Sequence, residues 1–116
     1  MKVYLAGGFE SEWRSTIKKS WLHEQFDFID PQEKENRKEF SVEEYICWDL
    51  YQIKNCDIVF CYISKDNPSG YGACVELGYA EALGKTVITV IEKNHPKYKY
   101  ILFTKGVSDV VYDALS

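Results

Sequence analysis

Two apolar segments, joined by a loop and a helix-length stretch, constrain the fold of this chain more than any other feature. Residues 58–63 and 87–91 have the length and the β-branched content of buried strands. Between them lie the turn-forming residues 66–70 and then a helical segment that ends at Gly84. A strand, a helix and a second strand in this order form a βαβ crossover, which predicts that the two strands are parallel.

The rest of the chain continues the alternation of strands and helices. Strand-like segments occur at residues 2–6, 26–29 and 110–112. We expect the first helix to have Ser11 as its N-cap and an apolar face made by Trp13, Ile17, Trp21 and Leu22. The charged residues 32–40 predict a solvated loop. The pattern predicts an α/β fold, a parallel sheet flanked by helices of the flavodoxin-like or Rossmann-like type, in a single domain spanning residues 1–116.

The composition narrows the classes of function. The chain of 116 residues is 46% hydrophobic and 28% charged, as in soluble globular domains. Its 14 basic and 18 acidic residues give a net charge of -4, without the basic block that a nucleic-acid polymer would require. The sequence shows no signal peptide and no apolar run long enough to span a membrane, so we expect a cytoplasmic protein that binds no membrane.

The cysteines and histidines do not form a metal-binding pattern. No cysteine pair has C-x-x-C spacing, and His23 and His95 have no metal-type spacing with each other or with the cysteines. We therefore expect neither a bound metal nor a redox cofactor. Buried, reduced thiols are expected at all four cysteines, which are Cys47, Cys56, Cys61 and Cys74.

An aspartate interrupts the apolar face of the second helical segment, which runs to about residue 55. Ser41 and Glu44 have the spacing of a capping box at its start. The inward stripe is expected to comprise Val42, Tyr45, Ile46, Asp49 and Ile53. Asp49 is either a buried structural residue that bonds a neighbouring loop or a carboxylate that faces a pocket.

A second carboxylate lies on an inward helix face. Glu76 follows Ala73 by three residues and precedes Ala80 by four, which places it among small residues that pack toward the sheet. Such a carboxylate is costly to bury unless it has a partner or faces a pocket. Gly7 and Gly8 follow the first strand, where glycines let a ligand approach the backbone closely or simply form a turn. Open α/β sheets bind their ligands at these strand ends.

Taken together, these residues resemble the nucleoside 2-deoxyribosyltransferase family, which includes relatives that hydrolyse deoxynucleoside 5'-monophosphates. The helix of Glu76 is similar to the family's Gly-x-x-x-Glu-Leu-Gly-Tyr-Ala segment, which begins here at Gly72. The first strand with its glycines and the helix of Asp49 resemble the family's corresponding parts. Residues 106–109, Gly-Val-Ser-Asp, resemble the C-terminal segment of the transferases, and the resemblance covers nearly the whole chain in order.

The resemblance implies roles for individual residues. Glu76 would be the nucleophile, and Asp49 would orient or protonate the leaving base. The remaining implied substrate-binding residues are Tyr4, Gly7, Gly8, Phe9, Ser69, Gly70, Gly72 and Asp109. Two positions differ from the family. Gly70 stands where the transferases have Asp and the hydrolases Ser, and Ile101 stands where the transferases have an Asn that binds the sugar 5'-hydroxyl.

The implied function is transfer of deoxyribose from a 2'-deoxynucleoside to another base, through a covalent intermediate on Glu76. Hydrolysis of deoxynucleoside 5'-monophosphates is the alternative, since Ser69 and the loop amides could hold a phosphate. A nucleotide-binding module without catalysis is the third possibility. Because the family builds part of each site from a neighbouring subunit, a homo-oligomer is implied as well.

Overall fold

The protein is built on one five-stranded parallel sheet. The computed structural model describes residues 1–9, 11–20, 26–34, 37–67 and 70–113. The strand order in the sheet is β2-β1-β3-β4-β5, and every neighbouring pair is parallel. The strands are β1 (Lys2–Gly7), β2 (Asp27–Ile29), β3 (Ile58–Ile63), β4 (Thr86–Ile91) and β5 (Val110–Tyr112). This arrangement confirms the predicted α/β class and the predicted crossover between residues 58 and 91.

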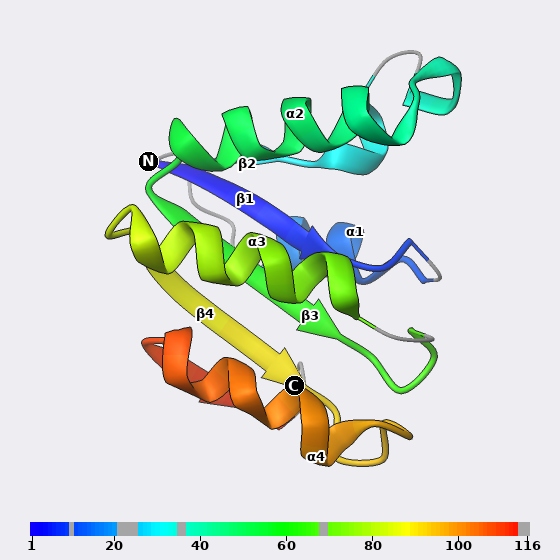
Figure 1. The fold of residues 1–116 in the computed structure, drawn as a ribbon, viewed down its shortest axis with the longest axis vertical. Helices are drawn as coiled ribbons and strands as arrows, with labels where there is room; N and C mark the ends of the chain where they lie inside the picture. Colours follow the sequence, from blue (N-terminus) through cyan, green and yellow to red (C-terminus); the bar gives the residue numbers. More distant parts are fainter. Residues whose placement is uncertain (10, 21–25, 35–36, 68–69, 114–116) are drawn as a thin grey trace.

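Helices cover both faces of the sheet. Helices α2, α3 and α4 lie on one face and α1 lies on the other (Figure 1). The α-helices are α1 (Trp13–Ser20), α2 (Val42–Lys54), α3 (Tyr71–Ala82) and α4 (Tyr98–Ile101). Short 3-10 turns occur at Pro31–Glu33, Arg37–Glu39 and Leu102–Val107. The first two lie at residues 31–33 and 37–39, within or beside the stretch 32–40 that was predicted to be a solvated loop, and Gln32, Glu33, Lys38 and Glu39 are exposed. None of the described helices is long and apolar enough to cross a lipid bilayer.

Alternation along the strands separates two hydrophobic clusters. Tyr4 and Ala6 of β1 pack with Leu77 of α3 on the face that carries α2 and α3. Val3 and Leu5 point the opposite way, into a cluster made with Trp13, Ile17, Phe60, Tyr62 and Val90. Successive strand residues alternate in this manner because their side chains point to opposite faces of the sheet. Both faces of β1 are therefore buried.

The direction of the crossovers changes between β1 and β3. The chain leaves β1 through α1, which covers one face, and leaves β3 through α3, which covers the other (Figure 1). The loops that follow β1 and β3 therefore diverge at the carboxyl edge of the sheet. In open α/β sheets, a ligand-binding crevice forms at this point, where the strand order reverses. The fold thus places its crevice between the first loop and α3.

The beginnings of two helices differ in how well the sequence predicts them. The capping box of α2 is confirmed, since the Ser41 hydroxyl accepts from the Glu44 amide and the Glu44 carboxylate accepts from the Ser41 amide. Such a cap stabilises a helix by about 1 kcal/mol. Helix α1 begins at Trp13 and is preceded by Glu12, so the prediction of Ser11 as its N-cap is wrong. Trp21 and Leu22 lie outside the described residues.

Three side chains that were predicted to be buried are exposed. Val42 and Ile46 of α2 have 54% and 42% of their surface exposed, whereas Ile53 at the other end of the stripe is fully buried. The outer turns of α2 extend past the sheet, so only the later part of its stripe reaches the core. Cys47, on the same helix, is also exposed, while Cys56 and Cys61 are buried as expected and all four thiols are free.

Candidate active site

A pocket of about 350 Å³ lies at the carboxyl edge of the sheet. Its walls are the loop after β1, the exposed end of α2 and the first half of α3. The residues that line it are Tyr4, Gly7, Gly8, Phe9, Pro31, Tyr45, Ile46, Asp49, Leu50, Gly72, Ala73, Val75 and Glu76. Apolar walls with a few polar groups are typical of small-molecule sites.

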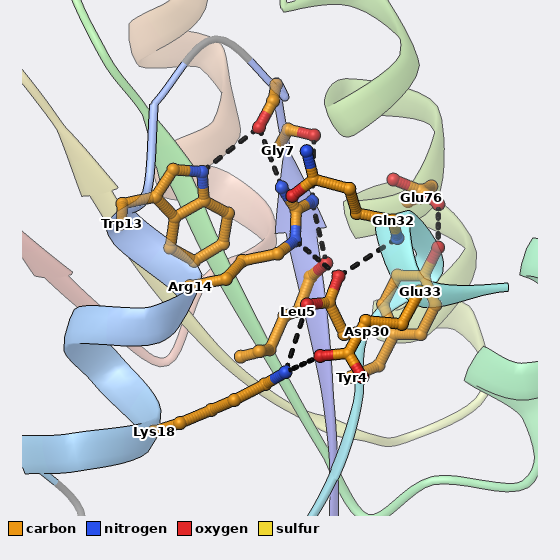
Figure 2. A network of polar contacts seen from close by, with 11 residues as sticks. Tyr4, Leu5, Gly7, Trp13, Arg14, Lys18, Asp30, Gln32, Glu33 and Glu76 are labelled. Carbon is orange, nitrogen blue, oxygen red and sulfur yellow. Dashed lines mark hydrogen bonds and ion pairs between the residues drawn. The ribbon is translucent and has the colours of Figure 1, made fainter.

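Glu76 is held at the pocket by a tyrosine of the central strand. The hydroxyl of Tyr4 donates a hydrogen bond of 2.6 Å to Oε2 of Glu76 (Figure 2). The ring of Tyr4 is fully buried in the core, whereas Glu76 is half-buried. Because an aromatic ring locked in a core has little freedom, the hydroxyl fixes the orientation of the carboxylate. Tyr4, which also lines the pocket, is therefore a partner of this half-buried carboxylate.

Asp49 reaches the same pocket from α2. It has only 8% of its surface exposed, and it lies one helical turn after Tyr45 and one before the buried Ile53. The structure thus brings the two predicted catalytic carboxylates, Asp49 and Glu76, to one pocket from two different helices. An arrangement of this kind can present one carboxylate to a sugar and the other to a leaving group.

The loop after β1 is a tight turn that only glycine can make. Gly7 has φ of +138°, and a Cβ atom there would lie 2.4 Å from the carbonyl oxygen of Tyr62. This φ lies in the region that side chains rarely adopt. Gly8 and the exposed Phe9 continue the pocket wall. The predicted binding residues of this loop therefore all line the pocket.

The other predicted binding residues are placed differently. Gly72 lines the pocket, but Gly70 does not: it is the N-cap of α3, with φ of +74°, and is packed against Ile63 and Ile101. Ser69 lies outside the described residues. Asp109 does not line the pocket, because its carboxylate accepts the amide of Val87 near the amino end of β4. That bond places Asp109 on the edge of the sheet away from the pocket.

Arg14 was missed in the sequence, although it contacts the pocket loop. Only 2% of its surface is exposed. Its guanidinium donates to the backbone carbonyls of Leu5, Gly7 and Gly8 and pairs with Asp30 (Figure 2). Burial lowers the pKa of Arg14, while the negative charges of Asp30 and Glu76 act in the opposite direction. The available signal was its position beside Trp13 and one turn before Ile17, on the inward face of the helix.

The family of the chain follows from comparison of its sequence with family models. Residues 1–94 match the model described as "Nucleoside 2-deoxyribosyltransferase like". This range contains the whole pocket, including both carboxylates. A comparison with curated proteins gave no match.

Three solved structures share the fold of this chain. A 2-deoxyribosyltransferase from Bacillus psychrosaccharolyticus has 30% identity and a TM-score of 0.63, over 78% of this chain and 72% of that one. A 2-deoxyribosyltransferase from Leishmania mexicana has 20% identity and a TM-score of 0.70, over 98% and 91%. A CMP N-glycosidase from Clostridium botulinum has 21% identity and a TM-score of 0.63, over 98% and 90%. By its sequence match and its fold, the chain belongs to the nucleoside 2-deoxyribosyltransferase-like family.

Proposed function

We propose that the protein is a nucleoside 2-deoxyribosyltransferase that cleaves the N-glycosidic bond of a 2'-deoxynucleoside and transfers the sugar to another base. The observation that carries this proposal is the Glu76 carboxylate, oriented by Tyr4 in a pocket that Asp49 shares. The membership of the chain in its family supports an enzyme that acts on nucleosides or nucleotides.

The reaction is a double displacement at the sugar carbon C1'. An oxygen of Glu76 attacks C1', and the electron pair of the breaking C1'–N bond moves to the base nitrogen. Asp49 orients the departing base or supplies the proton that it gains. The nitrogen of a second base then attacks C1' while its proton passes to Asp49, and the bond between C1' and Glu76 breaks, which restores the Glu76 carboxylate. If water attacks instead, the outcome is hydrolysis.

Positive charge grows on the sugar as the C1'–N bond breaks. The Glu76 carboxylate stabilises this charge before it forms the covalent bond. A sugar that lacks the 2'-hydroxyl forms this cation more readily, so a deoxyribosyl substrate suits a site with two carboxylates. Tyr4 contributes by keeping the carboxylate in one orientation. None of these steps requires a metal or a redox cofactor.

A second candidate function is hydrolysis of deoxynucleoside 5'-monophosphates. The observation that favours it is Ile101, which is 4% exposed and packs beneath Gly70 in the core. An isoleucine in the core offers no polar atom to a sugar 5'-hydroxyl. The amino end of α3 at Gly72 could accept a 5'-phosphate instead, because helix N-termini favour anions.

We further propose that the active protein is a homo-oligomer. Ile46 and Val75 line the pocket, yet they have 42% and 62% of their surface exposed. Val42 and Tyr71, on the same two helices, are exposed as well. A second subunit over α2 and α3 would cover this apolar rim and complete the pocket wall. Sedimentation should detect a dimer or a larger even assembly; a fully active monomer would contradict it.

One incubation experiment separates the candidates. The protein is mixed with a 2'-deoxynucleoside and a second free base, and separately with each deoxynucleoside 5'-monophosphate. Formation of a new deoxynucleoside supports the transferase. Release of free base from monophosphates alone, with no exchange, supports the hydrolase. Saturable binding without any cleavage would mean a nucleotide-binding module.

A further inference from the structure

The carbonyl groups at the end of β1 converge on one buried cation. Nη2 of Arg14 donates to the carbonyls of Leu5 at 3.1 Å and of Gly7 at 3.0 Å, and Nη1 donates to the carbonyl of Gly8 at 2.7 Å. The indole of Trp13 also donates to Gly8, at 3.0 Å. Gly7 and Gly8 line the pocket, whereas Leu5 belongs to the other face of β1. Figure 2 shows the guanidinium of Arg14 among these contacts.

Asp30 anchors the guanidinium from the neighbouring strand. Oδ1 of Asp30 lies 3.1 Å from Nε of Arg14, although the Nε–H group makes no hydrogen bond. The same carboxylate accepts the amide of Gln32 at 2.9 Å and the ammonium of Lys18 at 3.1 Å. Asp30 is thus fixed by a turn and by a second cation, so that it holds Arg14 in place.

The contacts of Arg14 extend to the side chain at the tip of the loop. Its guanidinium carbon lies 4.7 Å from the ring centre of Phe9 and 4.4 Å from that of Trp13. Phe9 is exposed and lines the pocket. The cation–π contact with Arg14 therefore helps to hold the ring of Phe9 in position. Without the guanidinium, the carbonyls of Leu5, Gly7 and Gly8 would face one another with fewer donors, which is costly in a buried place.

We propose that Arg14 is a positioning residue for the glycosidic reaction: it holds residues 7–9 in the shape that binds the substrate. The kinetic consequences of this inference rest on the proposed function. Its structural claim, that Arg14 orders residues 7–9, rests on the contacts of Arg14 alone. The negative charges of Asp30 and Glu76 favour the charged form of Arg14, which is the form that donates to the carbonyls. A lysine cannot replace it, because one ammonium cannot span three carbonyls and Asp30.

The kinetic test compares Arg14→Lys with Lys19→Met. Lys19 lies on the same helix as Arg14 and is exposed, and it takes no part in the contacts described for Arg14 and Asp30. Arg14→Lys should lower kcat/KM at least about tenfold, mostly through a higher KM, because the loop binds ground state and transition state alike. Lys19→Met should change either constant less than about twofold. If Arg14→Lys only reduced the fraction of folded protein, the apparent kcat would fall and KM would stay the same.

Hydrogen exchange tests the structural claim without any activity. In Arg14→Lys, the amides of residues 5–9 should exchange at least about tenfold faster than in wild type, while those of 86–91 stay unchanged. In the wild type, NMR should show separate, slowly exchanging Nη protons for Arg14. The NMR signature requires no variant, so the claim remains testable if Arg14→Lys does not fold.

Chemical rescue tests the role of the guanidinium itself. Arg14 borders a second depression with Asp30 and Ser15, through which a small cation can enter once the side chain is removed. Methylguanidinium should restore the KM of Arg14→Ala toward the wild-type value, and methylammonium should not.

Two results would overturn the proposal. One is exchange of the amides of residues 5–9 in Arg14→Lys that is as slow as in Lys19→Met. The other is a KM of Arg14→Lys equal to that of the wild type. If the wild type cleaves no nucleoside or nucleotide, the proposed function fails, and the exchange and NMR measurements still decide whether Arg14 orders the loop.

Discussion

The hydroxyl of Tyr4 donates to Oε2 of Glu76 across 2.6 Å, and this bond connects the central strand β1 to helix α3 at the pocket. A hydrogen bond to a carboxylate is shorter and stronger than one between neutral groups. The carboxylate is thereby oriented before any substrate binds. Orientation of a reacting group in advance removes part of the entropic barrier of the reaction.

Replacement of Tyr4 by Phe should separate this orientation from core packing. Tyr4→Phe keeps the buried ring and removes only the hydroxyl, so that the free energy of unfolding should change by about 1 kcal/mol. The value of kcat should fall about 10- to 100-fold, because the carboxylate loses its fixed direction. Steady-state kinetics and urea unfolding measure the two effects. An unchanged kcat would mean that the bond has only a structural role.

Glu76→Gln should nearly abolish turnover. The amide keeps the shape of the side chain but loses the charge and the nucleophilic oxygen, so kcat should fall by about 10³-fold or more. Glu81→Gln, on the exposed side of the same helix, is the control and should keep normal activity. Binding of substrate by Glu76→Gln, measured by calorimetry, should remain. Near-normal turnover by this variant would end the assignment.

The covalent intermediate on Glu76 should be trapped by a 2-fluoro-deoxyribosyl analogue. The fluorine slows the breakdown of the intermediate, so that the wild-type chain gains the mass of one sugar. Peptide mass spectrometry should place that mass on Glu76. A label on any other residue contradicts the mechanism.

Asp49→Asn should slow the reaction according to the leaving group. The variant cannot donate a proton to the base, so the loss in kcat should be about 10²-fold for bases that depart poorly. Bases that depart easily should show a smaller loss. A series of deoxynucleosides with different base pKa values measures this dependence. The same loss for every base would mean that Asp49 only supports the structure.

Two Gly→Ala substitutions should have opposite effects on stability. Gly7→Ala places a methyl group 2.4 Å from a backbone oxygen at a strained φ, so that it should lower the free energy of unfolding by more than about 1 kcal/mol and raise KM. Gly78→Ala, within α3 and with no atom within 4 Å of the added carbon, should stabilise by about 0.5–1 kcal/mol. Thermal unfolding of both variants checks the contrast.

The cysteines should react with thiol reagents in an order set by burial. Cys47 is exposed, whereas burial, and then the charge of Glu76, raise the pKa of Cys61 well above its usual value. At a given pH, a thiol with a raised pKa carries less of the reactive thiolate. At neutral pH, Cys47 should be alkylated first and Cys61 only after unfolding. Rapid labelling of Cys61 in the native protein would contradict the burial.

The fold could be predicted from the sequence because its signals are local. The buried strands at residues 58–63 and 87–91 are long apolar runs, and the capping box at Ser41 is a spacing of three residues. Glu76 and Asp49 were found because a carboxylate on an apolar helix face is conspicuous. Each of these signals lies within one segment of the chain.

The remaining parts depend on contacts between distant segments. Arg14 was missed because its partners are the carbonyls of β1 and the carboxylate of Asp30, which no pattern within α1 reveals. Asp109 was assigned to the site by resemblance, but it bonds to Val87 in the sheet. Ile46 was expected in the core, yet it is exposed and borders the pocket. The position of α2 relative to the sheet depends on tertiary packing, which the sequence of α2 alone does not reveal.

The ring of Tyr4 belongs to the core and its hydroxyl belongs to the site. Any substitution that shifts the packing around this ring, at Leu77 for example, also displaces the atom that orients the carboxylate. Substitutions near this ring should therefore change the stability of the protein and its catalytic rate together. Attempts to evolve a new substrate preference have more freedom at the exposed end of α2, where changes leave the ring of Tyr4 in place.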